Sequence, residues 1–309
     1  SLRAKLRSRG VFEGSAEPDL RNMLDIVALG TVADLAPLRG VNRLLVSTGL
    51  RVLKGRRRIG LDALLTASGI RPGDPIEASH LGFRLGPRIN AAGRLAEAAR
   101  SVELLLSEDP AEARSIAEEL DAYNAKRQDI ERRTFAEALE QIHADPESDS
   151  RKGLVLWSEE WHSGVVGIVA GRIAQHVNKP TLVLAVKPGE GEATGSGRAI
   201  PGVDLFSALK ANENLLVRFG GHRAAAGLTI RESNLSELRS AFSGPAFSKD
   251  DPECWEGKLS YDAELSLVNI DWDLHGDVEQ LAPFGIGNAQ PLFVLRGAIA
   301  RRVKSLRKG

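Results

Sequence analysis

The sequence predicts an α/β protein in which a long helix joins two different parts and the start of a small β-barrel follows. Three observations predict this architecture. Short buried strands alternate with helices through residues 153–230, a helical stretch without glycine or proline fills most of residues 109–145, and apolar and polar residues alternate after residue 255. A chain of 309 residues also exceeds one ordinary core, which favours several domains.

The N-terminal part is predicted to be helical. Residues 24–38 form an apolar run that is interrupted by Asp25 and Asp34, and they read as a buried helix that passes into a turn closed by Pro37. Two further helices are predicted, over residues 43–53 and 61–67.

Asp34 has apolar neighbours, so its carboxylate must be paired, protonated or metal-bound, because burying a bare charge is costly. Aspartate is also a preferred N-cap, and helix starts are common. From the residues alone, a helix cap and a metal ligand are equally good interpretations.

The long helix has a clear start signal. Asp109 is a good N-cap, Pro110 suits the first helical position, and Glu112 would complete a capping box. No glycine or proline follows until Pro146, which gives a helix of roughly 50 Å. Residues 145–152 are polar and turn-rich, so they mark a boundary.

The next part reads as strands and helices in turn. Strands are predicted over residues 153–157, 181–186, 194–200 and 225–230, with a helix over 164–177 capped by Ser163, a helix from 204 to 211 capped by Asp204, and a loop over 218–222. Ser196 and Arg198 fall on one face of their strand, because side chains alternate with period two.

Three elements combine small residues with polar or charged ones: RINAAGR at residues 88–94, GSGR at 195–198 and GGH at 220–222. Small residues let backbone approach a ligand, and the arginine fork matches phosphate geometry. Each element alone is better explained by a turn and a solvated arginine. The three together favour a phosphate pocket, to which the helix start at residues 163–167 could add backbone N–H groups.

Composition excludes several classes of protein. The formal net charge is zero, which argues against a binder driven by charge alone, and aromatic residues make up only 5%, so base stacking is not the main binding mode throughout. The basic runs at residues 54–58 and 296–308 read as solvated charge. The lone Cys254 excludes an intrachain disulfide and fits a reducing, cytoplasmic compartment, and no apolar run is long enough for a membrane helix.

No Walker A, G-x-S-x-G, H-E-x-x-H or C-x-x-C pattern is present, and the six histidines are never paired at metal-ligand spacing. His162, just ahead of a helix start, reads as structural. His222, flanked by glycines and alanines, is the best functional candidate among the histidines.

Six segments occur in order: LDIVALGTVADLAPL, LGFRLGPRINAAGR, EEWHSGVVGIVAGRI, GSGRAIPGVDL, RFGGHRAAAGL and LAPFGIGNAQPLF. Together they resemble the bacterial RecJ single-strand-specific 5′→3′ DNA exonucleases of the DHH phosphoesterase superfamily. The resemblance implies the C-terminal part of a DHH domain (1–108), a connecting long helix (109–147), a DHH-associated substrate-binding domain (148–250) and the beginning of an OB-fold (251–309). The family's D-x-D and D-H-H motifs and the end of the OB-fold are not in this sequence, so we expect this fragment alone to be inactive.

The resemblance also assigns roles to residues. It makes Asp34 a catalytic ligand of a two-metal Mn²⁺ or Mg²⁺ site, which the rest of the family's motifs would complete. It places His222 near the scissile phosphate, and it implies that Phe284 and the β segment belong to the OB-fold, which can guide single strands. The implied phosphate-binding residues are Arg88, Asn90 and Arg94 on the nucleic-acid backbone, Ser196, Gly197 and Arg198 at the terminal 5′ phosphate, and Gly220 and Gly221.

The implied function is the hydrolysis of single-stranded DNA from a 5′ end in DNA recombination and repair. The expected partners are single-stranded DNA, single-strand-binding protein and a helicase, with no membrane, and the expected state is a monomer. One alternative is a nanoRNase or cyclic-dinucleotide phosphodiesterase of the same superfamily, which would lack the long helix and the OB-like tail. The other is a non-catalytic scaffold that keeps the fold but not the metals.

Overall fold

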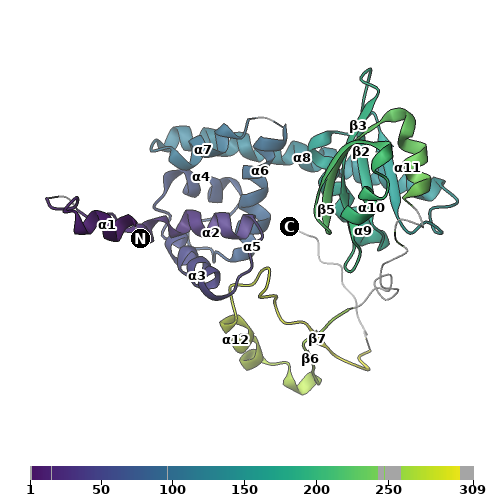
Figure 1. Cartoon of the computed structure of the whole chain (residues 1–309). Coiled ribbons are helices and arrows are strands. Elements are labelled where there is room, and N and C mark those ends of the chain that lie inside the picture. Colours follow the sequence, from purple (N-terminus) through teal and green to yellow (C-terminus); the bar gives the residue numbers. More distant parts are fainter. Residues whose placement is uncertain (1, 15, 96, 243–246, 248–258, 300–309) are drawn as a thin grey trace. The chain divides into compact units, whose positions relative to one another are not determined.

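The computed structural model describes residues 2–14, 16–95, 97–242, 247 and 259–299 (Figure 1). The chain divides into two compact units. The first unit contains Ser1–Asn90, Ala99–Asp121 and Ser260–Gly309, and the second contains Ala91–Ala98 and Ala122–Leu259. Cys254 lies outside the described residues. Within the described ranges, no helix is both long enough and apolar enough to cross a membrane.

The N-terminal part of the first unit is helical, as the sequence predicts. The helices up to residue 106 are α1 (Leu2–Ser8), α2 (Leu24–Ala33), α3 (Gly40–Lys54), α4 (Ile59–Ala67), α5 (Ala78–His80), α6 (Gly86–Leu95) and α7 (Ala99–Leu106), with a 3-10 turn at Leu20–Met23 and a π-helical turn at Leu81–Leu85. The residues of α6 from Ala91 onward belong to the second unit. The helices predicted over residues 24–38, 43–53 and 61–67 are confirmed as α2, α3 and α4. The RINAAGR element is also helical, because it lies inside α6.

Helices α2 and α3 pack closely because Gly49 has no side chain. A Cβ at Gly49 would lie 2.1 Å from the carbonyl oxygen of Leu24. The buried Asp25 of α2 is paired with Arg58, whose Nε lies 3.0 Å from its carboxylate. A buried charge needs such a partner, so the first aspartate of the apolar run has a structural role.

The long helix is α8 (Pro110–Ala144), with 35 residues. Its predicted cap is confirmed, since the carboxylate of Asp109 accepts a hydrogen bond of 2.9 Å from the N–H of Ala111. The predicted capping box is wrong. The carboxylate of Glu112 accepts instead from the hydroxyl of Ser107, at 2.6 Å.

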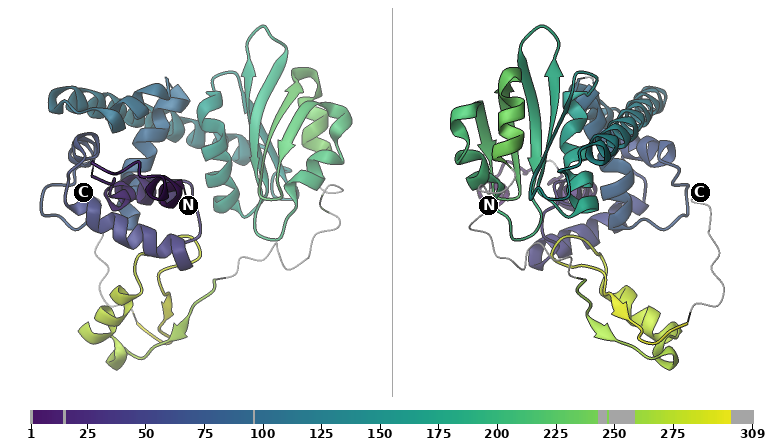
Figure 2. Two further views of the ribbon diagram at one scale, coloured as in Figure 1. Left: turned by 60° about the vertical axis from the view of Figure 1, so that its left-hand side comes forward. Right: turned by 90° about the vertical axis from the view of Figure 1, so that its right-hand side faces the viewer.

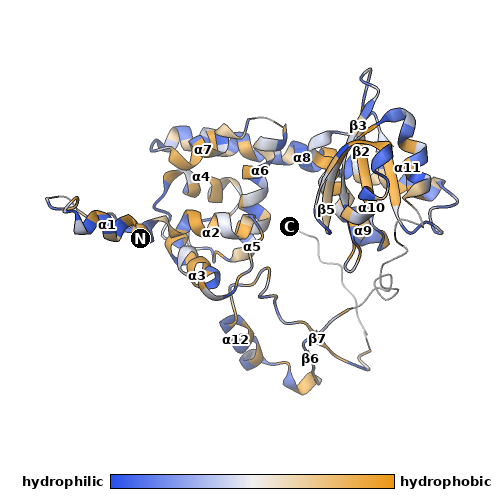
Figure 3. Cartoon of the chain, in the orientation of Figure 1, coloured by the Kyte–Doolittle hydropathy of each residue, from blue (hydrophilic) through white to orange (hydrophobic). Residues whose placement is uncertain are grey.

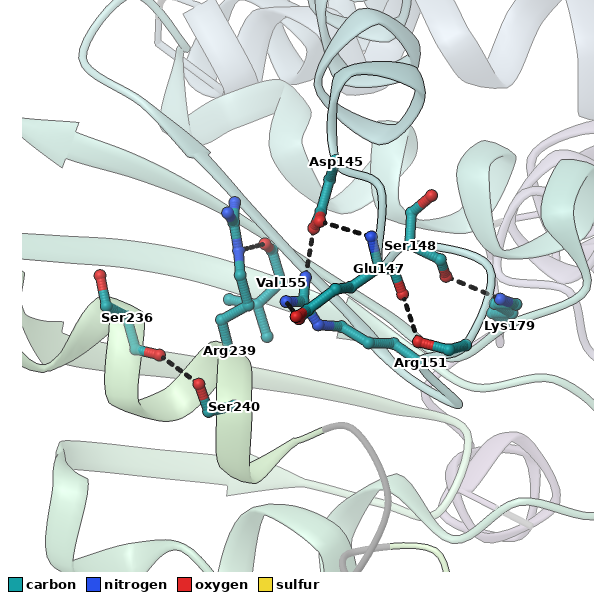
Figure 4. Close-up of polar contacts among 10 residues, drawn as sticks. Asp145, Glu147, Ser148, Arg151, Val155, Lys179, Ser236, Arg239 and Ser240 are labelled. Carbon is teal, nitrogen blue, oxygen red and sulfur yellow. Dashed lines mark hydrogen bonds and ion pairs between the residues drawn. The ribbon is translucent and has the colours of Figure 1, made fainter.

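The turn between α8 and the sheet is braced by two cationic side chains (Figure 4). The guanidinium of Arg151 contacts the carboxylates of Asp145 and Glu147. The Nζ of Lys179 donates to the carbonyl oxygen of Ser148 at 2.8 Å, and burial lowers the pKa of this lysine. The polar boundary predicted from the sequence is therefore an ordered turn.

The second unit is built on a five-stranded sheet. The strands are β1 (Leu154–Ser158), β2 (Thr181–Lys187), β3 (Glu192–Arg198), β4 (Leu216–Gly221) and β5 (Ala225–Arg231), in the order β1-β2-β3-β5-β4. The first pair is parallel and the others are antiparallel. The four predicted strands are confirmed. The loop predicted over residues 218–222 is wrong, because pairing with β5 makes most of it a strand despite its glycines.

Apolar residues of β2 alternate between two cores, one on each face of the sheet. Figure 2 shows helices on both faces of this sheet, and Figure 3 shows orange, hydrophobic residues along its strands. Leu182 and Leu184 pack with α10 (Leu205–Lys210) and α11 (Leu235–Ala241). Val183 packs on the other face with α9 (Ser163–Val177) and the end of α8. The sheet is therefore covered by helices on both faces. The predicted cap of α10 is confirmed, with Asp204 accepting from the N–H of Ser207.

Residues 259–299 contain little regular structure. They form β6 (Ala263–Glu264), a 3-10 turn (Leu267–Asn269), α12 (Trp272–Gln280) and β7 (Phe293–Val294). In the sequence, Leu259, Tyr261, Ala263 and Leu265 alternate with polar residues, which predicts an antiparallel strand. The described residues form only the two-residue β6 there, and it pairs in parallel with β7. The predicted antiparallel strand is wrong in both length and direction.

Candidate phosphate site

Ser196 and Arg198 lie side by side on one face of β3. Buried and half-buried residues alternate along this strand, so the two side chains share the half-buried face. The Nη1 of Arg198 donates to the Ser196 hydroxyl at 2.7 Å and to the carbonyl oxygen of Gly197 at 2.8 Å. The Ser196 hydroxyl in turn donates to the carbonyl oxygen of Ala226, at 3.3 Å.

The guanidinium of Arg198 is half-buried without a counter-charge. Within the described residues no carboxylate lies within ion-pair distance of it, and its Nε and Nη2 groups make no hydrogen bond. Burial lowers the pKa of Arg198, and the nearby charge of Arg94 lowers it further. Two arginines that lie close together without a carboxylate form a site that an anion would stabilise.

Helix α9 approaches this face through a glycine. A Cβ at Gly167 would lie 3.2 Å from the Ser196 hydroxyl oxygen and 3.3 Å from Nη2 of Arg198, which is tighter than ordinary packing. At Gly171, a Cβ would lie 3.7 Å from Cγ of Arg198, which is ordinary contact. A side chain in place of Gly167 would therefore crowd Ser196 and Arg198, whereas one in place of Gly171 would not.

The start of α9 differs from the predicted anion site. His162, not Ser163, is the N-cap, and its Nδ1 accepts from the N–H of Gly164 at 3.0 Å. The next N–H, that of Val165, donates to the carbonyl oxygen of His162. These two N–H groups are therefore already used by the cap. The structural reading of His162 is confirmed.

Arg94 connects the end of α6 to the start of α9. Its Nη1 donates to the carbonyl oxygen of Gly164 at 2.9 Å, and its side chain is otherwise exposed. Arg88 and Asn90, the other two residues predicted to contact the nucleic-acid backbone, lie in the first unit. Arg88 is paired with Asp121, with 2.8 Å between Nε and the carboxylate, while Asn90 is exposed.

The glycines of the site have different roles. A Cβ at Gly197 would lie 2.4 Å from Cδ2 of Leu182, so this glycine serves the core face of β3. Gly221 has φ +146°, and a Cβ there would lie 2.4 Å from the carbonyl oxygen of Ala225. Gly220 is exposed, and a Cβ there would meet no described atom within 4 Å, so of these three glycines Gly220 is the one that leaves the surface open to a ligand.

An open concavity of about 390 Å³ lies on β3, β5 and β4, and its lining includes Thr194, Arg218, Gly220, Gly227 and Thr229. The Nε of Arg218 donates to the Thr229 hydroxyl at 3.1 Å. Arg218 was missed by the sequence analysis, because a residue assigned to a loop has no defined face. His222 is exposed after β4, and its N–H donates to the carbonyl oxygen of Ala225 at 2.9 Å.

Asp34 is the C-cap of α2, so the N-cap interpretation is wrong. Its side chain is exposed and makes no hydrogen bond or ion pair with another described residue. A free carboxylate is a suitable hard ligand for Mg²⁺ or Mn²⁺. However, the described residues contain no group of three or more His, Cys, Asp or Glu that could hold a metal ion.

Comparison with known proteins identifies the family. Residues 150–244 match the DHHA1 domain, and residues 261–309 match the RecJ OB domain. The chain is 41% identical over 303 residues to the single-stranded-DNA-specific exonuclease RecJ of Dickeya dadantii and 38% identical over 302 residues to that of Escherichia coli, covering 95% of this chain in each case. The chain belongs to the RecJ family.

Solved structures of RecJ also match the fold of this chain. RecJ from Thermus thermophilus, in complex with Mg²⁺, matches with a TM-score of 0.78 and 34% identity, over 92% of this chain and 43% of that one. The exonuclease RecJ bound to manganese matches with a TM-score of 0.63 and 37% identity, over 77% of this chain and 57% of that one. The chain spans about half of the curated RecJ relatives, 52% of the Dickeya protein. The RecJ OB domain disfavours the shorter phosphodiesterases of the superfamily.

Two other predicted features of the chain have structural partners. In the basic run at residues 54–58, Arg56 pairs with Asp62 at 2.6 Å and Arg58 with Asp25, so neither arginine is merely solvated charge. Phe284 is half-buried, lies in the matched RecJ OB domain and lines a cavity of about 270 Å³ with residues of α3 and α5.

Proposed function

We propose that the RecJ enzyme to which this chain belongs hydrolyses single-stranded DNA from its 5′ end, and that Ser196 and Arg198 bind the terminal 5′ phosphate. The observation that carries the proposal is the half-buried guanidinium of Arg198 without a carboxylate partner among the described residues. A phosphate would supply the counter-charge and accept hydrogen bonds from Nε and Nη2. A terminal phosphate has more negative charge than an internal diester, so this site distinguishes an end.

The metal chemistry rests on the relatives. RecJ of T. thermophilus was solved with Mg²⁺ and with Mn²⁺, which supports a divalent cofactor. Asp34 would hold one ion, and the D-x-D and D-H-H motifs of the family would supply other ligands. When bound, such ions activate water and stabilise charge on the attacking and leaving oxygens.

The other predicted residues bind and orient the strand in this proposal. Arg94 extends the positive charge beside the 5′ phosphate, and His222 contacts the scissile phosphate. The open surface at Gly220 lets the DNA backbone come close, with Arg218 as a further cation in the same concavity. Arg88 and Asn90 contact the DNA backbone, with Arg88 shared between phosphate and Asp121.

The cellular role follows from this activity. We propose that the enzyme acts on 5′ ends in DNA repair and recombination in the cytoplasm, as a monomer, with single-strand-binding protein and a helicase as partners. These proteins would present or open the single strand that the enzyme digests.

The activity is tested in the chain preceded by the D-x-D and D-H-H region of a RecJ relative, here called the completed enzyme. With Mn²⁺, we expect it to digest single-stranded DNA that is blocked at its 3′ end and to leave intact a strand blocked at its 5′ end. The 309-residue chain alone is the control and should digest neither strand, because in this proposal Asp34 is one metal ligand and the D-x-D and D-H-H motifs supply the others. Digestion of the 5′-blocked strand at an equal rate would overturn the proposed direction.

A further inference from the structure

A segment near the C-terminal end of the described chain is bound to the residues that directly follow the turn with Asp34. This segment, residues 281–288 (LAPFGIGN), is here called the clip. The N–H of Leu38, four residues after Asp34, donates to the carbonyl oxygen of Ile286 at 2.6 Å. Both segments belong to the first unit, so the contact lies inside one compact body.

Two arginines at the start of α3 hold the same segment through its backbone. The Nε of Arg39 donates to the carbonyl oxygen of Gly287 at 2.6 Å. The Nη2 of Arg43 donates to the carbonyl oxygens of Leu281 and Ala282, at 2.7 and 3.2 Å. The clip therefore presents carbonyl oxygens to donors on the corner between α2 and α3.

The clip has its own internal bracing. The side-chain amide of Asn288 donates to the carbonyl oxygens of Leu281 and Pro283, both at 2.9 Å. The backbones of Gly285 and Asn288 also exchange two hydrogen bonds, of 2.9 and 3.0 Å. A braced loop can hold a neighbouring turn in one position, because it has few conformations of its own.

The two segments approach each other closely at the glycines of the clip. A Cβ at Gly285 would lie 2.8 Å from Cδ1 of Leu38. Gly287 has φ +75°, and a Cβ there would lie 3.2 Å from Cβ of Pro37. Both glycines of the clip thus touch the residues that follow the Asp34 turn.

The Asp34 turn is itself strained. Leu35, the residue after Asp34, has φ +57°, a left-handed conformation that costs a non-glycine residue free energy. Leu35 is 67% exposed, so burial of its own side chain does not maintain this conformation. A strained conformation persists where the surrounding contacts hold it, and the clip supplies such contacts on the far side of the turn.

We propose that the clip fixes the position of the Asp34 carboxylate, so that Arg39 and Arg43 are positioning residues for the metal site. The inference rests on the proposed metal role of Asp34 and adds a second element that controls it. Because the clip lies in the RecJ OB domain, the start of that domain acts on the geometry of the turn that carries Asp34.

Hydrogen–deuterium exchange of the 309-residue chain tests the positioning directly. In the double variant Arg39→Gln, Arg43→Gln, amides 34–39 should exchange about tenfold faster, while the amides of β2 and β3 are unchanged. The matched control is Arg51→Gln, also on α3, whose guanidinium donates hydrogen bonds, among the described residues, only to Ser47 and Thr48 of its own helix. Equal exchange of amides 34–39 in the double variant and the control would overturn the proposal.

A pair of glycine variants tests the same contact by a substitution in the clip itself. This second test remains valid if the arginine variant misfolds. Gly287→Ala should accelerate exchange of amides 34–39. Gly297→Ala should not, since Gly297 has a similar φ of +68° but nothing within 4 Å of its Cβ position. If the two alanine variants behave alike at these amides, the clip does not hold the turn.

The effect of the clip on metal binding is measured in the completed enzyme. Arg39→Gln, Arg43→Gln should raise the Mn²⁺ concentration for half-maximal activity by about tenfold and leave the Kd for single-stranded DNA in EDTA unchanged. Asp34→Ala separates the metal role of Asp34 from the positioning role of Arg39 and Arg43. If that variant stays active, the metal role is wrong; if it is inactive while the arginine variant keeps the normal Mn²⁺ dependence, the positioning role is wrong.

Discussion

The guanidinium of Arg198 donates a hydrogen bond of 2.7 Å to the hydroxyl of Ser196, its neighbour on the same face of β3. This bond aims the arginine while leaving its Nε and Nη2 groups without a partner among the described residues. An arginine that is oriented by a hydroxyl and lacks a carboxylate is ready to bind an anion. The first prediction below depends on this relationship.

Arg198→Ala in the completed enzyme should weaken the use of 5′-phosphorylated single strands much more than that of 5′-hydroxyl strands. Losing a charge-assisted contact costs about 1.5–3 kcal/mol, or one to two orders of magnitude in kcat/KM for the phosphorylated strand. The measurement is kcat/KM on both strands at one salt concentration, because all phosphate contacts are screened by salt. Equal losses on both strands would make Arg198 an ordinary backbone contact.

Gly167→Ala should impair the same site, whereas Gly171→Ala should not. Each substitution gains about 1 kcal/mol of helix propensity in α9. At Gly167 the new methyl group would crowd Ser196 and Arg198, and at Gly171 it would meet Arg198 at ordinary contact distance. We expect Gly171→Ala to raise the free energy of unfolding and keep activity, and Gly167→Ala to lose about tenfold in activity on 5′-phosphorylated strands. Identical activities of the two variants would contradict this account.

Asp34→Ala should abolish turnover in the completed enzyme and leave DNA binding largely intact. The carboxylate is free at the end of α2, and the predicted phosphate contacts are made by other residues. Turnover is measured with Mn²⁺, and the Kd for single-stranded DNA is measured in EDTA. Near wild-type digestion by the variant would show that Asp34 only ends its helix.

Arg58→Met should destabilise the 309-residue chain by about 3 kcal/mol, because it leaves the buried carboxylate of Asp25 without its counter-charge. Arg57→Met is the matched control, since this neighbouring arginine is exposed. Urea unfolding gives both free energies. A common midpoint for the two variants would mean that the buried pair contributes nothing beyond an exposed arginine.

The sequence by itself determined the local elements whose signals lie within a few residues. Period-two alternation placed Ser196 and Arg198 on one face of β3, and a capping aspartate with a following proline placed the start of α8 correctly. The ordered motifs indicated the RecJ family before any contact was known. These features depend on neighbouring residues alone, so they can be read without the fold.

Only the tertiary structure decided which groups become partners. Whether Glu112 bonds to its own helix start or to Ser107, and whether His162 or Ser163 caps α9, depends on the path of the chain before the helix. The glycines of residues 218–221 form a strand because β5 lies beside them. The clip is the extreme case, since Arg39 and Gly287 are 248 residues apart and no local pattern joins them. Hydrogen-bonding groups with several possible partners are assigned by packing, which brings distant donors and acceptors together.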